Sequence, residues 1–453
     1  MTSSILKKIE TLPIPIGRIL SAVPFGLRPG LGRRYSLLQS NAIRYLESPD
    51  FPKERYILEN VKKIVRFAES QIPFYAQLYK KNGFCSDNLK TLDDMKRIPI
   101  VNKQILREAA PADVEHAEPG RFAANTGGTS GSPFCFYLSS RTNANEWAHM
   151  HLIWKKFGYT QRKIYLSIVG RSIKGIDKKF VCYDALRNRF LFNIYIDYEK
   201  STQVLLKYAK RYPIEFLHGY PGSIYDYARF CETLPENELA VLRKNLKGVF
   251  LSSEYPVPIY RDKIEEVFQV PTVSWYGHSE RIILAWERNE KFVYWPFQTY
   301  GFTEAIKQND EKFHLIGTSY DNTAFPLIRY DTEDFVEPIQ YDSNGVLQTF
   351  AINEARSVDF VQDKKGQNIS LTALFFGRHH SIYQMASHIQ IEQTEPGKAV
   401  MYIVMDNPSS DFQPSAYFSL DGIDIDFSYQ IVDKPFRTKI GKIPLKINAN
   451  LKK

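Results

Sequence analysis

Long apolar runs are missing from this sequence of 453 residues, and no stretch approaches the roughly 20 apolar residues that a membrane helix needs. The N-terminus also lacks the compact apolar segment of a secretion signal. Only four cysteines are present, Cys85, Cys135, Cys182 and Cys231, and none has CxxC spacing. This scarcity argues against a disulfide framework or a cysteine metal cluster and favours a reducing compartment. We therefore expect a cytoplasmic protein without a transmembrane segment.

Signatures of nucleic-acid binding are also missing, since no helix-turn-helix, zinc-finger or RRM pattern occurs. The net charge is +9, but lysine and arginine are spread along the chain rather than clustered. Such a field suits small anionic substrates such as nucleotides, and no nucleic-acid partner is expected. Among the nine histidines, His379, His380 and His388 lack a fourth ligand, which favours a loop pair over a zinc site.

What is present is the composition of an ordinary folded protein, with 43% hydrophobic and 24% charged residues. The length is too great for one core and predicts two or three domains. Residues 1–115 predict mainly helices. One helix is indicated by apolar residues at near-helical spacing before Pro73. These residues are Ile57, Val61, Ile64, Val65 and Phe67.

An apolar and basic segment precedes that helix, "LPIPIGRILSAVPFGLRPGLGRRY" at residues 12–35. Its prolines and glycines rule out one long helix. A weak peripheral membrane contact and an arm packed on the protein body are the two interpretations. The packed arm is favoured, because no continuous amphipathic face survives the prolines.

From about residue 120 the pattern changes to strands that alternate with helices. "LKGVFLSSE" (246–254), "PIYRDKIEEVF" (258–268) and "TVSWYGHSE" (272–280) predict strand, helix and strand, a βαβ unit in a parallel sheet. After about residue 355 a hairpin around Gly366 and a short basic tail indicate a second unit. We predict an α/β fold with a large N-terminal domain at 1–355 and a small C-terminal α+β domain at 356–453.

A small-residue segment, "NTGGTSGSP" at 125–133, stands between the helical and the strand-rich parts. Glycine allows close backbone approach, and successive N–H groups with hydroxyls can cradle phosphate oxygens. No Gly-Lys-Ser/Thr follows, so this is not a Walker loop. Taken alone, the segment fits a phosphate loop and a plain surface turn equally well.

Five motifs in a fixed order give the segment its context: "TGGTSGSP", "WYGHSE" (275–280), "PLIRYDTEDF" (326–335), "ARSVDFV" (355–361) and "RTKIGKIPLKI" (437–447). The chain thereby resembles the adenylate-forming superfamily of AMP-forming ligases. Within it, the chain looks like the branch of phenylacetate–CoA ligase-like and CapK-like proteins of capsular polysaccharide biosynthesis. The resemblance implies a large adenylating domain with mixed or parallel sheets and a small mobile C-terminal lid.

The resemblance also implies an activity. ATP and a carboxylic acid would form an acyl-adenylate and release pyrophosphate. The acyl group would then pass to CoA, or to an amine or amino-sugar acceptor, in surface polysaccharide biosynthesis. ATP and Mg²⁺ are the implied cofactors, with CoA as a further candidate. The acid, the acceptor and the choice between monomer and homodimer stay open.

Residue roles follow from the same resemblance. Lys442 and Glu280 are the implied catalytic residues, with Glu280 also the Mg²⁺ ligand. The implied ATP contacts are Thr126, Gly127, Gly128, Thr129, Ser130, Gly131, Tyr276, Gly277, Ser279, Asp334 and Arg356. The implied acyl-pocket residues are Tyr220, Pro221 and His278, and Asp359 is the implied hinge.

Two positions depart from the family pattern. Ser132 stands where a lysine often follows the phosphate loop, and Glu333 replaces the usual glycine before Asp334. Both departures favour the alternative function, a non-catalytic nucleotide-binding or scaffold protein that keeps the fold.

For several of these residues, an ordinary structural role is the alternative to the functional one. Glu280 could form a solvent-facing ion pair with Arg281. Asp334 could belong to a charged turn, and Tyr276 to the core. Lys442 could lie in a solvated basic tail, where Lys439 competes with it for the catalytic role.

Overall fold

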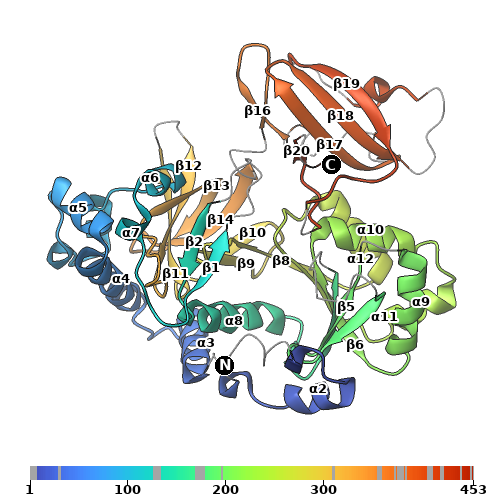
Figure 1. The fold of residues 1–453 in the computed structure, drawn as a ribbon, viewed down its shortest axis with the longest axis horizontal. Helices are drawn as coiled ribbons and strands as arrows, with labels where there is room; N and C mark the ends of the chain where they lie inside the picture. Colours follow the sequence, from blue (N-terminus) through green and yellow to red (C-terminus); the bar gives the residue numbers. More distant parts are fainter. Residues whose placement is uncertain are drawn as a thin grey trace.

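The computed structural model describes residues 8–28, 32–125, 134–168, 179–194, 197–308, 312–354, 360–371, 374, 382, 385–405, 412–418, 423–438, 441–448 and 451. In this part of the chain, a large unit is built on a twelve-stranded sheet and a smaller C-terminal unit on a four-stranded sheet. Figure 1 shows the small unit standing beside the large one, above the helices at its right-hand side. The predicted α/β class is confirmed.

Helices dominate the first 115 residues, as predicted. They are α2 (Ile14–Ser21), α3 (Gly32–Glu47), α4 (Lys53–Gln71), α5 (Pro73–Lys81), α6 (Lys103–Glu108) and α7 (Pro111–Val114). The apolar stripe predicted for α4 is buried, except that Phe67 is only half-buried and packs edge-on against His116. Pro73 opens α5, because the first position of a helix needs no N–H donor.

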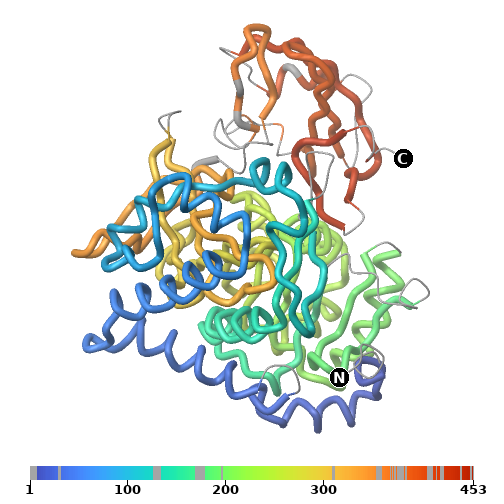
Figure 2. The backbone as a smooth tube through the Cα atoms, turned by 60° about the vertical axis from the view of Figure 1, so that its left-hand side comes forward, coloured from blue at the N-terminus to red at the C-terminus, as the bar shows by residue number. Residues whose placement is uncertain are grey.

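The N-terminal arm packs on the hairpin of β4 (Val181–Asp184) and β5 (Arg189–Phe192). The Ala185 N–H donates to the Glu10 carbonyl oxygen, and Arg187 pairs with the Glu10 carboxylate at 3.0 Å. A Cβ at Gly17 would come within 2.5 Å of the Tyr183 ring, so glycine permits this close contact. Figure 2 shows the arm running along the end of the molecule opposite the C-terminal unit.

The large sheet has the order β11-β12-β13-β14-β10-β9-β8-β7-β6-β3-β5-β4. Its remaining strands are β3 (Ile164–Ile168), β6 (Ile214–Gly219), β7 (Gly248–Leu251), β8 (Thr272–Gly277), β9 (Leu284–Glu287), β10 (Val293–Pro296), β11 (Gly301–Lys307), β12 (Phe313–Ser319), β13 (Tyr330–Tyr341) and β14 (Leu347–Glu354). Strands β3, β6, β7 and β8 run parallel to their neighbours in this series, whereas β8 to β14 pair antiparallel. The predicted βαβ unit is confirmed as β7, α12 (Pro258–Phe268) and β8.

Helices cover both faces of the parallel strands, and successive residues of one strand therefore enter different cores. Phe250 of β7 stacks on Trp154 of α8 (Arg141–Lys155), with 4.8 Å between the ring centroids. Its neighbours Val249 and Leu251 pack instead into the core of the opposite face. That core is formed with α9 (Tyr198–Ala209), α10 (Pro221–Cys231), α11 (Glu236–Arg243) and α12.

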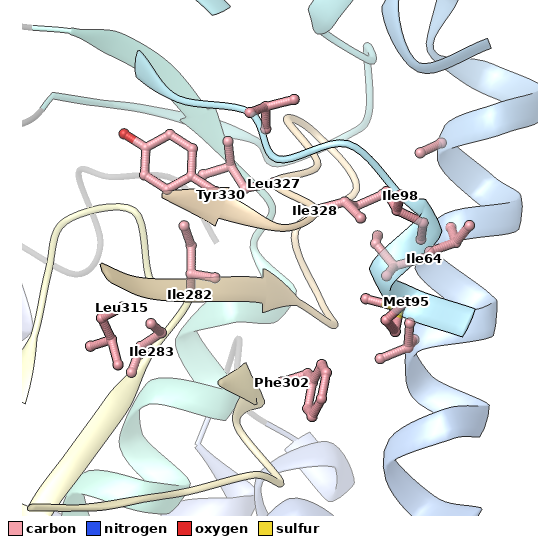
Figure 3. Packing of buried hydrophobic residues seen from close by; sticks show 14 of the residues in the cluster. Ile64, Met95, Ile98, Ile282, Ile283, Phe302, Leu315, Leu327, Ile328 and Tyr330 are labelled. Atoms are coloured by element: carbon pink, nitrogen blue, oxygen red, sulfur yellow. The ribbon is translucent and has the colours of Figure 1, made fainter. Parts of the chain in front are cut away.

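The antiparallel strands pack against the N-terminal helices in a separate core. Figure 3 shows Ile64 of α4 and Met95 facing the side chains of the strands, with Ile98 and Ile328 between them. These four side chains are at most 2% exposed. The helical segment is thereby part of the large unit rather than a separate body.

The C-terminal unit has its own apolar core, built mainly from β17 (Ala386–Glu395) and β18 (Lys398–Met405). Its sheet has the order β19-β18-β17-β20, with β19 (Asp426–Val432) and β20 (Lys446–Ile447) both added in parallel. The predicted hairpin around Gly366 is confirmed as β15 (Phe360–Gln362) and β16 (Asn368–Ser370). Among the described helices, none has the length and apolarity to cross a membrane. The four cysteines are free.

Two buried histidines of α8 should make stability depend on pH. His149 donates from Nδ1 to the Asn145 carbonyl oxygen at 2.9 Å, and burial lowers its pKa from 6.5 to about 4. Burial likewise lowers the pKa of His151 to about 3. Because the pKa of each histidine in the folded state lies below 6.5, the unfolded chain binds more protons than the folded chain between that pKa and pH 6.5. The contribution of these two histidines to the free energy of unfolding should therefore be fully present above pH 6.5 and should be lost as the pH falls below that value.

We expect His149 alone to remove about 2 kcal/mol of unfolding free energy between pH 7 and pH 5. Urea unfolding of the wild type and of His149→Gln at both pH values measures this contribution. The variant should lose less stability over the interval, whatever its stability at pH 7. An identical pH dependence in both proteins would contradict the assignment.

Candidate active site

The carboxyl ends of neighbouring parallel strands gather the predicted site residues at one edge of the large sheet. Tyr220 follows β6, Ser253 follows β7, and His278 follows β8, and these three strands are consecutive in the sheet. Ligands of open α/β sheets bind at this edge, because the loops after parallel strands all emerge there. The edge is therefore where the chemistry of the large unit is expected.

Tyr276, at the end of β8, connects this edge to β13. Its hydroxyl donates to Asp334 Oδ2 at 2.5 Å, and its ring meets Phe350 edge-on at 6.0 Å. Three strands separate β8 from β13 in the hydrogen-bonding order, so the sheet must curve to bring them together. The structure thus joins two predicted nucleotide contacts, Tyr276 and Asp334. Asp334 is buried.

Glu280 lies in the turn after β8 and is only 8% exposed. The Tyr330 hydroxyl donates to Glu280 Oε1 at 3.5 Å, and His278 Nδ1 is 3.7 Å from Oε2. Burial, and then the negative charge of Glu280, raises the pKa of Tyr330. Arg281 turns to α8 and donates to Thr142 and Asn143. Glu280 is therefore not the solvent-facing partner considered above.

The donor set at Glu280 fits a magnesium ion. Mg²⁺ prefers oxygen ligands and is commonly held by one or two carboxylates together with substrate phosphates. A buried carboxylate beside a tyrosine hydroxyl, at the edge where a phosphate would bind, meets that requirement. Among the described residues, no group of three or more His, Cys, Asp or Glu side chains that could hold a metal ion occurs.

The acidic residues near the start of β13 have different environments. Asp331 pairs with His314 Nδ1 at 2.8 Å, whereas Asp334 accepts from Tyr276. Glu333, the residue that replaces the usual glycine, has a positive φ of 61°. Burial, followed by Asp331, raises its pKa. This backbone conformation is one that glycine adopts more easily than glutamate.

Lys442 reaches the same edge from the C-terminal unit. Its Nζ donates to the Ser253 carbonyl oxygen at 2.7 Å and lies 5.6 Å from the centre of the Tyr220 ring. Gly441, with φ of 83°, makes the preceding turn, which Lys442 N–H closes by donating to Thr438 Oγ1. Lys442 therefore contacts the large unit rather than only solvent.

Glu254, beside Ser253, is a site residue that sequence reasoning missed. Its two carboxylate oxygens accept from the N–H groups of Gly222 and Ile443, each at 3.1 Å. Burial raises its pKa, while Lys442 and the two N–H donors oppose the shift. The carboxylate joins the N-terminus of α10 to the C-terminal unit. The signal available in the sequence was a glutamate in the short loop that follows a buried strand.

The predicted site residues fall into two groups among those described. Tyr276, His278, Glu280 and Asp334 cluster around the end of β8, with Gly277 and Ser279 exposed in the same turn. Tyr220 and Pro221, at the start of α10, lie with Lys442 near the ends of β6 and β7. Tyr330 was also missed, although it stands inside a quoted motif.

The remaining predicted residues lie outside the described part of the chain. These are Thr126, Gly127, Gly128, Thr129, Ser130, Gly131, Ser132, Arg356, Asp359 and Lys439. The strands on either side of the glycine-rich segment are described: β1 (Phe122–Asn125) and β2 (Cys135–Leu138) pair antiparallel. The roles proposed for these residues stay predictions.

Arg329, in the motif before Asp334, has a structural environment. Its guanidinium donates to the Ile98 carbonyl oxygen at 2.7 Å and pairs with Glu304 at 3.3 Å. Burial raises the pKa of Glu304, while Arg329 opposes that shift. Arg329 is itself buried, and it thereby ties β13 and β11 to the helical segment.

No protein-family model matches this sequence, and no curated protein matches it. Solved structures do match. 2-Hydroxyisobutyryl-CoA ligase in the postadenylation state, in complex with 2-HIB-AMP, has a TM-score of 0.65 at 17% identity, over 89% of this chain and 91% of that chain. The same ligase in the thioesterification state, with 2-HIB-AMP and CoA, has a TM-score of 0.53 at the same identity and coverage.

A second similar structure is the acyl acid amido synthetase GH3.15 in complex with 2,4-DB. Its TM-score is 0.58 at 13% identity, over 92% of this chain and 94% of that chain. At such low identity these likenesses concern the fold. The chain has the fold of adenylate-forming ligases, with a separate C-terminal domain.

Replacing Arg329 should destabilise the fold, because the largely buried Glu304 carboxylate would lose its ion-pair partner. We expect Arg329→Met to lower the free energy of unfolding by about 3–5 kcal/mol, as measured by urea unfolding. Arg97→Met, at an exposed position of the same region, is the control and should change it by less than about 0.5 kcal/mol. Equal effects of the two variants would show that the Arg329 contacts contribute little.

Proposed function

We propose that this protein is an AMP-forming ligase, which activates a carboxylic acid with ATP and transfers the acyl group to a second substrate. The proposal is supported by one contact between the units. Lys442 of the small unit donates to the loop after β7, and the neighbouring strand β8 ends in the turn that holds Glu280. A cation and a buried carboxylate at adjacent strand ends suit a reaction between two anions, which requires charge to be screened and the attack to be aligned.

In the first step, a carboxylate oxygen of the acid attacks the α-phosphorus of ATP. The bond between the α-phosphorus and the bridging oxygen of pyrophosphate breaks, and pyrophosphate leaves with that electron pair. In the second step, a nucleophile attacks the acyl carbon, loses its proton and displaces AMP. The two steps need no oxidant or reductant.

The proposed residue roles follow from position and charge. Lys442 neutralises the negative charge of the carboxylate and the α-phosphate as they react, a task that suits a flexible point charge. Asp334, oriented by the Tyr276 hydroxyl, accepts hydrogen bonds from the ribose hydroxyls. Glu280 would hold Mg²⁺, which supplies charge neutralisation at the phosphates when bound. The glycine-rich segment 126–131 and Arg356 are proposed as further nucleotide contacts.

The acceptor defines the finer proposal. Motifs that resemble the phenylacetate–CoA ligase-like and CapK-like branch support CoA or an amino sugar as the acceptor, in surface polysaccharide biosynthesis. The acyl group would lie near Tyr220, Pro221 and His278, which follow the ends of β6 and β8 on either side of β7. A mixed panel of acids, followed by CoA or amino sugars and mass spectrometry, separates these acceptors.

A non-catalytic nucleotide binder is the second candidate. It is favoured by Ser132, which leaves the glycine-rich segment without the lysine often found there. Such a protein would bind ATP but would not release pyrophosphate in the presence of any acid. Calorimetry together with a pyrophosphate assay distinguishes it from the ligase.

The decisive assay is Mg²⁺-dependent exchange of labelled pyrophosphate into ATP, measured across a broad panel of carboxylic acids. We expect exchange with at least one acid, and we expect Glu280→Gln to reduce it by about 100-fold because a Mg²⁺ ligand is lost. Glu290→Gln, at an exposed position, is the matched control and should leave exchange unchanged. Folded protein that shows no exchange with any acid would refute the ligase.

Lys442→Ala tests the role of the lysine. We expect adenylation to fall by about 100-fold or more, with ATP affinity changed by less than about threefold, since the lysine acts mainly in the transition state. Single-turnover adenylation and calorimetry with ATP give the two quantities. Lys434→Ala, an exposed lysine of the same unit, should alter neither. Unchanged turnover in Lys442→Ala would remove this lysine from the site.

A further inference from the structure

A charged cluster between the two units lies outside the residues used above. Asp226 of α10 faces the small unit, where its Oδ1 accepts from His388 Nε2 and its Oδ2 accepts from Arg437 Nη2. His388 Nδ1 is hydrogen-bonded to the hydroxyl of Tyr260, at 2.9 Å. The His388 side chain is 1% exposed. One carboxylate of the large unit thus binds two basic side chains of the small unit.

Arg437 carries this contact towards Lys442. Its Nη1 donates to Ser223 Oγ at 3.1 Å and to the Gly441 carbonyl oxygen at 3.0 Å. The guanidinium therefore links Asp226 with the peptide unit that immediately precedes Lys442. A planar guanidinium with several fixed donors can hold such a set of acceptors rigidly, which a lysine cannot.

The segment after Gly441 is held from the other side as well. Ile443 N–H donates to Glu254, and Lys442 Nζ donates to the Ser253 carbonyl oxygen. Gly222 allows this approach, since a Cβ there would lie 3.2 Å from the Ile443 side chain. Gly441 and Lys442 are therefore held between Arg437 and the loop after β7.

We propose that Asp226 is a positioning residue, which sets the place of Lys442 at the strand edge by anchoring Arg437, and that His388 completes the anchor. This inference rests on the proposed function, in which Lys442 acts on the carboxylate and the α-phosphate. Asp226 itself touches no reacting atom in this scheme. It acts through two hydrogen-bonded links, Arg437 and the Gly441 carbonyl group.

The electrostatics keep the anchor intact at neutral pH. Burial alone would raise the pKa of Asp226, but His388 and Arg437 hold it below its ordinary value. Tyr198 and Arg229 also interact electrostatically with this carboxylate. An ionised Asp226 forms charge-assisted hydrogen bonds, which are roughly twice as strong as neutral ones. The link to Arg437 is therefore maintained across the physiological range.

Hydrogen exchange of the full-length protein tests the positioning without any need for activity. The N–H groups of Gly441, Lys442 and Ile443 all have acceptors, and in wild type their peptide should be protected. In Asp226→Asn, we expect exchange of this peptide to rise about tenfold or more, while the peptides of β17 and β18 keep their protection. Glu232→Gln is the matched control, because Glu232 ends the same helix and forms an exposed pair with Lys263.

The catalytic measurement asks whether a substitution changes kcat or KM. A lysine displaced by about 1 Å should lower the kcat for adenylation by about 10- to 100-fold in Asp226→Asn, with the KM for ATP changed by less than about threefold. Arg437→Lys keeps the positive charge without the planar fork and should give the same division. Glu232→Gln should match the wild type in both measurements.

The outcomes separate this inference from the proposed function. Unchanged exchange of the 441–443 peptide in both Asp226→Asn and Arg437→Lys would overturn the positioning role, whatever the activity. A rise in exchange accompanied by an unchanged kcat would also overturn it, and would leave only a structural contact. If exchange rises but Lys442→Ala retains full activity, the role of the lysine in the proposed function fails instead.

Discussion

The parallel pairing of β3, β6, β7 and β8 is the constraint on which the rest of the structure depends. These strands are buried on both faces, so their register is specified by two cores at once. Their carboxyl ends must then emerge at one edge, and three consecutive loops place Tyr220, Ser253 and His278 there. Function is proposed at this edge because side chains from three consecutive strand ends converge there.

Curvature of the sheet brings residues of the antiparallel strands to the edge formed by the parallel strands. Tyr276 and Asp334 are 58 positions apart, and they meet only because the antiparallel strands fold back towards β8. The same bend brings Tyr330 to Glu280. The carboxylates proposed to bind the ribose and the metal thus lie in one cluster on one sheet, which suits a site that must hold a nucleotide in a single orientation.

The local sequence pattern predicted much of this architecture, whereas contacts between residues far apart in the sequence could not be predicted from it. The βαβ unit at 246–280 and the stripe of α4 follow from periodicity, which depends on neighbouring residues. The contacts of Asp226 do not, because His388 and Arg437 lie 162 and 211 positions away. Arg329 shows the reverse case: its motif suggested the nucleotide site, yet its guanidinium binds the helical segment. A residue type in a motif indicates a region, whereas its partners depend on tertiary packing.

The division of charge between the two units has a consequence for catalysis. The carboxylates Glu280 and Asp334 belong to the rigid large unit, whereas the lysine that would neutralise the reacting anions belongs to the small one. A complete site then requires docking, so the energy that holds the units together also determines how often the lysine is in place. Docking through Asp226 uses contacts that are specific to one arrangement, since His388, Arg437 and Tyr260 must all be in reach. An anchor of this kind favours one arrangement of the units over others, and its strength must stay moderate if a second step needs the lysine to withdraw.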